Sequence, residues 1–72
     1  MNALEIFRMV ATEFGNLPDE DVVNNEGKVT QYGIKSFIKL YADQISEKRF
    51  GASYQKALAY LTAHKLKMNG YG

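Results

Sequence analysis

His64 is the only histidine of the 72-residue chain, and therefore the first candidate for acid–base or metal chemistry. An imidazole base needs a nucleophile within hydrogen-bond reach, and a zinc site needs further Cys, His or carboxylate ligands. The chain has no cysteine, and the residues one helical turn from His64 are Tyr60 and Met68. A structural or surface histidine fits this setting better, so we assign His64 no chemistry.

The segment Asn24–Thr30 has the polar residues and the glycine of a calcium-binding loop. Such loops place Gly at position six and carboxylate ligands at positions one and twelve. With Gly27 at position six, Val22 occupies position one and Gly33 occupies position twelve. Neither residue offers a carboxylate, so the segment is not expected to bind calcium.

Other catalytic patterns are missing from the sequence. Glycine-rich phosphate loops, nucleophile elbows and carboxylate pairs at facing positions are absent. We therefore expect a protein that is not an enzyme, needs no cofactor and no metal, and works by binding other proteins.

Charge is distributed unevenly along the chain. Residues 1–26 hold six acidic side chains and one basic one, a net charge of −5. Residues 27–72 hold eight basic side chains and two acidic ones, a net charge of +6. Such a split either closes within one molecule or pairs the acidic part of one subunit with the basic part of a neighbour.

Helical spacing dominates the pattern of apolar residues. A helix over 3–14 is predicted, with Asn2 and Glu5 as a capping box. Pro18 and three acids predict a short helix over about 18–24. A third helix should begin near Thr30, and a fourth should follow Ser53 and end at Asn69-Gly70.

These elements predict an all-α fold, a small bundle of three to four helices without a sheet, forming one domain over residues 1–72. No apolar run approaches the roughly 18 residues that span a bilayer, so no membrane contact is expected. A chain this short buries a small core and often needs partners for stability. The predicted core comprises Ile6, Phe7, Val10, Phe14, Ile34, Phe37, Ile38, Tyr41, Ile45, Leu58 and Leu61.

The run Arg49–Leu66 (RFGASYQKALAYLTAHKL) resembles the head–tail connector, or head-completion, proteins of tailed phages and prophages. That family has an Arg/Trp-Gly-x-x-Tyr-x-x-Ala-Leu run that leads into a helix ending in Leu-x-Ala-His-x-Leu. The opening Phe7-Arg8…Glu13-Phe14…Leu17-Pro18-Asp19 resembles the family's own opening. Two features depart from the family: Ala11-Thr12 replaces an aromatic-Pro pair, and many relatives continue beyond the position of Gly72, so a minimal or truncated connector is expected.

The resemblance implies a structural protein of the virion that forms a ring beneath the portal and mediates tail attachment. Its partners would be portal-like proteins, tail or stopper proteins and copies of itself, with nucleic acid present only as DNA passing through the channel. It would reside at the head–tail junction of the virion, or in the host cytoplasm when expressed from a prophage. The residues that we expect at protein interfaces are Asp19, Glu20, Asp21, Arg49, Tyr54, Tyr60, Lys65 and Met68.

Two other classes of function stay open. The first is a small helical regulator that binds nucleic acid through lysines such as Lys65 and Lys67, although the sequence pI of about 8.0 is below that of typical nucleic-acid-binding domains. The second is a non-viral helical adaptor or inhibitor that docks an apolar helix face into a protein target.

Overall fold

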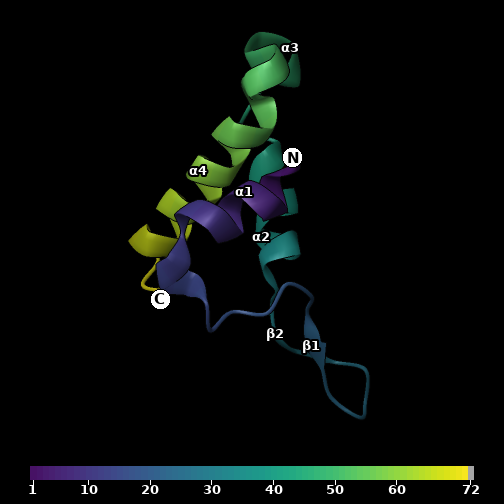
Figure 1. Cartoon of the computed structure of the whole chain (residues 1–72). Helices are drawn as coiled ribbons and strands as arrows, with labels where there is room; N and C mark the ends of the chain where they lie inside the picture. Colours follow the sequence, from purple (N-terminus) through teal and green to yellow (C-terminus); the bar gives the residue numbers. More distant parts are fainter. Residues whose placement is uncertain (72) are drawn as a thin grey trace.

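The computed structural model describes residues 1–71 and contains three longer helices, one short helix and a two-stranded antiparallel sheet. The sheet contradicts the predicted all-α fold. Figure 1 shows the hairpin at one end of an elongated molecule and α3 at the other, with overall extents of 41 × 23 × 22 Å. The elements in chain order are α1 (Ala3–Val10), β1 (Val22–Val23), β2 (Val29–Gln31), α2 (Ile34–Ala42), α3 (Glu47–Phe50) and α4 (Tyr54–Met68), with 3-10 turns over Thr12–Phe14 and Gly51–Ser53.

Helix α1 begins as predicted and ends earlier than predicted. The Asn2 side chain accepts a hydrogen bond from the Glu5 amide at 2.9 Å, and the Glu5 carboxylate accepts one from the Asn2 amide at 3.0 Å. The helix stops at Val10, and a 3-10 turn then brings Phe14 back to stack on Phe7, with ring centroids 5.8 Å apart. The stop at Val10 thus allows both aromatic rings to enter the core.

The helix predicted over 18–24 is wrong, because this segment leads into a β-hairpin. Val22 and Val23 form β1, and their β-branched side chains suit a strand better than a helix. The Asn24 side chain closes the turn by accepting hydrogen bonds from the amides of Glu26 and Lys28 at 2.9 and 3.0 Å. Gly27 completes the turn with φ +80°, a conformation that favours glycine.

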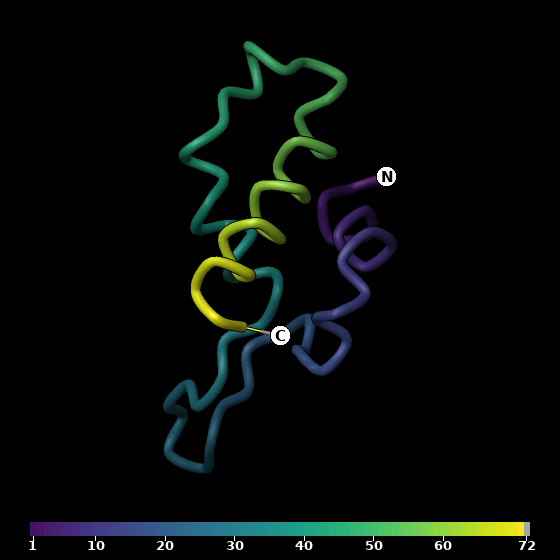
Figure 2. The backbone as a smooth tube through the Cα atoms, turned by 90° about the vertical axis from the view of Figure 1, so that its left-hand side faces the viewer, coloured from purple at the N-terminus to yellow at the C-terminus, as the bar shows by residue number. Residues whose placement is uncertain are grey.

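Helix α2 begins at Ile34, four residues after the predicted start, because Thr30 lies in β2. Its first amides are satisfied by the segment that precedes the hairpin. The amide of Ile34 donates to the carbonyl of Pro18 at 2.8 Å, and that of Lys35 donates to the carbonyl of Asp19 at 3.1 Å. The backbone before β1 therefore crosses directly over the N-terminus of α2, as the tube in Figure 2 allows the reader to follow.

The connector between α2 and α4 is partly helical, which the sequence pattern did not predict. The Ser46 hydroxyl caps α3 by accepting a hydrogen bond from the Arg49 amide at 3.1 Å. Ser53 stands directly before α4 as predicted, but its side chain makes no capping bond. The end of α4 is tied to α2, because the Asn69 side chain donates to the Tyr41 hydroxyl at 3.3 Å.

The core lies where α1 and α2 pack against α4. Six predicted core residues are buried: Phe7, Phe14, Ile34, Phe37, Tyr41 and Leu58. Four others are only partly buried, namely Ile6, Ile38, Ile45 and Leu61. Val10 is 42% exposed, so its assignment to the core is wrong. The prediction omitted the other buried positions, which are five small residues and one leucine: Ala3, Ala11, Gly33, Ala59, Thr62 and Leu66.

Candidate functional site

No arrangement suited to metal binding occurs within residues 1–71, where no three His, Cys, Asp or Glu side chains converge. His64 is exposed on α4. No helix of the described chain is long and apolar enough to cross a membrane.

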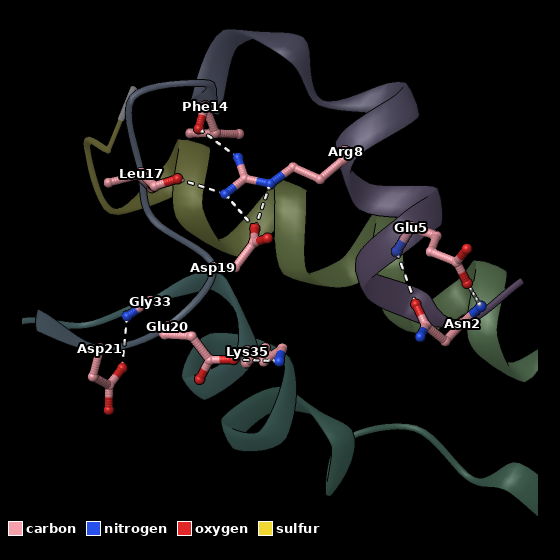
Figure 3. A network of polar contacts seen from close by, with 10 residues as sticks. All are labelled: Asn2, Glu5, Arg8, Phe14, Leu17, Asp19, Glu20, Asp21, Gly33 and Lys35. Carbon is pink, nitrogen blue, oxygen red and sulfur yellow. Dashed lines mark hydrogen bonds and ion pairs between the residues drawn. The ribbon is translucent and has the colours of Figure 1, made fainter.

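The three predicted interface acids are engaged inside the molecule (Figure 3). The Arg8 guanidinium forms an ion pair with Asp19 at 2.7 Å, and it also donates to the carbonyls of Phe14 at 3.0 Å and Leu17 at 2.5 Å. Glu20 forms an ion pair with Lys35 on the first turn of α2. These contacts tie α1, the loop before the hairpin, and α2 together.

Asp21 completes this network at the N-terminus of α2. One carboxylate oxygen accepts hydrogen bonds from the Gly33 amide at 2.6 Å and from the Ser36 hydroxyl at 2.7 Å. These two bonds stabilise the charged form, first that from Gly33 and then that from Ser36, and so lower the pKa of Asp21. Similarly, the hydrogen bond from the Lys35 ammonium to Glu20 and the attraction between their charges raise the pKa of Lys35. The acidic segment thus stabilises the positive end of a helix dipole, that of α2.

The other predicted interface residues lie along α3 and α4. Arg49, Tyr60 and Met68 are exposed, and the two apolar side chains are 48% and 67% accessible. Tyr54 and Lys65 are half-buried. Tyr54 opens α4 and Met68 closes it, so the helix separates them by about 21 Å along its axis. The structure therefore does not gather the eight predicted residues into one patch.

An apolar groove that the prediction did not single out lies on the outer side of α2. It has a volume of about 420 Å³ and is lined by Tyr32, Ser36, Phe37, Leu40 and Tyr71. The Phe37 ring meets the ring of Tyr32 at 6.4 Å and that of Tyr71 at 5.1 Å, both edge to face. Leu40 is 60% exposed, and its position outside the apolar stripe of α2 was the one sequence signal for this groove.

The hairpin exposes three valines, two of which face each other across the strands. Val23 and Val29 are cross-strand partners, and Val22 lies beside them on β1. The two strands have no further neighbour within the described chain, so both edges offer unpaired backbone groups. A hairpin this short is marginal by itself and gains stability when another surface covers it. Because Tyr32 directly follows β2, the groove begins where the hairpin ends.

Comparison of the chain with protein-family models, with curated proteins and with solved structures found no match.

Proposed function

We propose that the protein is a structural subunit of the head–tail connector of a tailed phage or prophage, which assembles beneath the portal and mediates tail attachment. The support from the sequence is the similarity of Arg49–Leu66 and of the opening segment to that family. The support from the structure is the pair of apolar surfaces at one end of the molecule, the hairpin valines and the groove on α2.

The two surfaces differ in shape, and this difference suits a ring. The hairpin extends away from the helices (Figure 1), whereas the groove is concave. A ring needs a heterologous interface, in which each subunit uses two different patches. We propose that the hairpin valines of one copy pack against the groove of the next copy. Each patch is small compared with a stable interface, so the free protein should be monomeric or weakly associating and should form a ring only on a portal-like partner.

The acids Asp19, Glu20 and Asp21 take a different part in this proposal from the one expected from the charge split. They are bonded to Arg8, Lys35 and the start of α2, and of the two ion pairs only Glu20–Lys35 joins the acidic half of the chain to the basic half. Contact between copies then rests on apolar surface, and the acids contribute by fixing the angle at which the hairpin leaves the helices.

The test uses portal-bearing capsids produced by the same genome without this protein. Added protein should restore retention of packaged DNA and tail attachment. Leu40→Lys in the groove and Val23→Lys on the hairpin should each abolish this effect, because a charge would be buried in the contact. Met9→Lys is the matched control, since Met9 is 65% exposed on α1 outside both surfaces. All three variants should keep the wild-type circular dichroism spectrum.

The alternatives give different results in the same experiment. If the protein leaves such capsids unchanged but shifts duplex DNA at physiological salt, the connector proposal fails and a nucleic-acid-binding regulator replaces it. If it does neither, a helical adaptor for another protein target takes its place. The observation in favour of the regulator is that α4 carries three lysines and no acidic side chain.

A further inference from the structure

The outer face of α4 carries a row of exposed side chains that includes two lysines. Lys56, Tyr60, His64 and Lys67 follow one another at intervals of three or four residues, which places them on one side of a helix. All four are exposed. The two lysines lie about 16 Å apart along the helix axis. We call these four residues the α4 outer face.

No acidic side chain balances this face. Helix α4, Tyr54–Met68, contains no Asp or Glu. Within residues 1–71 the ion pairs join Arg8 to Asp19 and Lys35 to Glu20, so neither involves a lysine of α4. Asp19 and Glu20 are engaged in these pairs and Asp21 is bonded at the start of α2, so these three acids are not free to pair with α4 of a neighbouring copy. The exposed lysines of α4 are thus available to a negatively charged partner.

We infer that the α4 outer face binds the phosphate backbone of duplex DNA without reading its sequence; this rests on the proposed function, in which the connector surrounds DNA. Lysine ammonium groups are point charges that suit phosphates, and Arg, Asn and Gln are among the side chains that read base edges. The outer face has none of these three. The nearest amide, Gln55, is half-buried, and its oxygen accepts a hydrogen bond from the Ala3 amide at 2.8 Å.

The two lysines set the expected size of the effect. Each phosphate contact adds about −0.9 to the slope of log affinity against log salt, so two contacts add about −1.8. Between 50 and 200 mM salt, the ratio of wild-type affinity to that of a variant without both lysines should therefore fall roughly twelvefold. In a ring, repeated faces along one duplex would strengthen the contact through avidity.

The test measures fluorescence anisotropy of two labelled duplexes of unrelated sequence, with the full chain, at 50, 100 and 200 mM salt. The variant is Lys56→Gln/Lys67→Gln. The control is Lys28→Gln/Lys39→Gln, which removes the same charge from exposed lysines on the hairpin and on α2. The wild type and the control should bind both duplexes alike with the steeper salt slope, and the variant should lose it. Absence of wild-type binding at 50 mM, or an equal loss in the control, would overturn the inference.

The capsid assay separates this inference from the proposed function. If Lys56→Gln/Lys67→Gln binds DNA weakly but still loads on the capsids, both stand. If it binds DNA as the wild type does but fails to load, the α4 outer face is a protein contact and the inference is overturned, while the connector function stands. If the wild type binds DNA through this face and ignores capsids, the inference stands and the connector function falls.

Discussion

Replacing Gly33 by Ala tests the crossing of the acidic segment over α2. Gly33 is buried directly before α2, and a Cβ built on it would lie 2.5 Å from the Asp19 carbonyl oxygen and would also meet the Glu20 backbone. Both contacts are with backbone, so the crossing segment itself must move. Overpacking of this kind costs about 1–3 kcal/mol. Weakening of one of the bonds from Ile34 or Lys35 to this segment would add about 0.5–1.5 kcal/mol.

The expected loss for Gly33→Ala is therefore at least about 1.5 kcal/mol, which lowers Tm by about 6–12 °C or more in a domain of this size. Thermal and urea unfolding followed by circular dichroism measure it. Gly15→Ala is the matched control, because Gly15 has φ −60° and a Cβ there comes no closer than 3.4 Å to the nearest atom. The control should be neutral or slightly stabilising. A Gly33→Ala protein that melts like the wild type would show that the segment does not cross α2 this closely.

Three further predictions concern the same end of the molecule. Phe37→Ala should cost about 3–5 kcal/mol in urea unfolding, because the ring is buried between the core and the groove. A free energy of unfolding close to that of the wild type would refute this. Reversing Asp19, Glu20 and Asp21 to Lys should reduce the helical circular dichroism signal, since three cations would face Arg8 and the positive end of α2. The lowered pKa of Asp21 stabilises the fold above its unfolded value of 3.8, and this contribution is lost as the pH falls through the still lower folded pKa. Asp21→Asn should therefore flatten the acid limb of the unfolding midpoint plotted against pH, and an unchanged limb would contradict the bonds to this carboxylate.

Features encoded by neighbouring residues could be predicted from the sequence. The capping box of α1 depends on two residues three positions apart, and both of its bonds are present. The apolar spacing of α2 identified Ile34, Phe37 and Tyr41 as its buried face, and all three are buried. The end of α4 at Met68 also follows from the Asn69-Gly70 pair that comes next.

The segment 18–24 could not be assigned in this way, because its role depends on a distant helix. Pro18 and three acids are typical of a helix N-terminus, and the acids do lie at one. That helix is α2, more than ten residues further along the chain, and local spacing does not reveal the connection. The pair Val22-Val23 followed by Asn24 and Gly27 is the local pattern in this segment that is typical of a hairpin.

The face of α4 was misjudged for a different reason. Hydrophobicity favoured Leu61 as a core residue of α4, yet Leu61 is only partly buried. Ala59 and Thr62 are fully buried instead, and the Thr62 hydroxyl is satisfied by the Leu58 carbonyl at 2.8 Å. Small side chains of this kind allow α1 and α2 to pack closely on α4, but they add little to a hydrophobicity pattern. The same error concealed which face of α4 points outward.

The charge split of the sequence has a consequence for assembly once its two halves are located. Its acidic half holds the start of α2 in place through Asp19, Glu20 and Asp21, while Lys56 and Lys67 of its basic half stay exposed on α4. In the proposed connector, contacts between copies come from the hairpin valines and the groove, and apolar contacts of this kind are not weakened by salt. Contacts of the α4 outer face with phosphates are weakened by salt. Raising the salt concentration should therefore release DNA from the assembled protein while the ring on its portal-like partner persists.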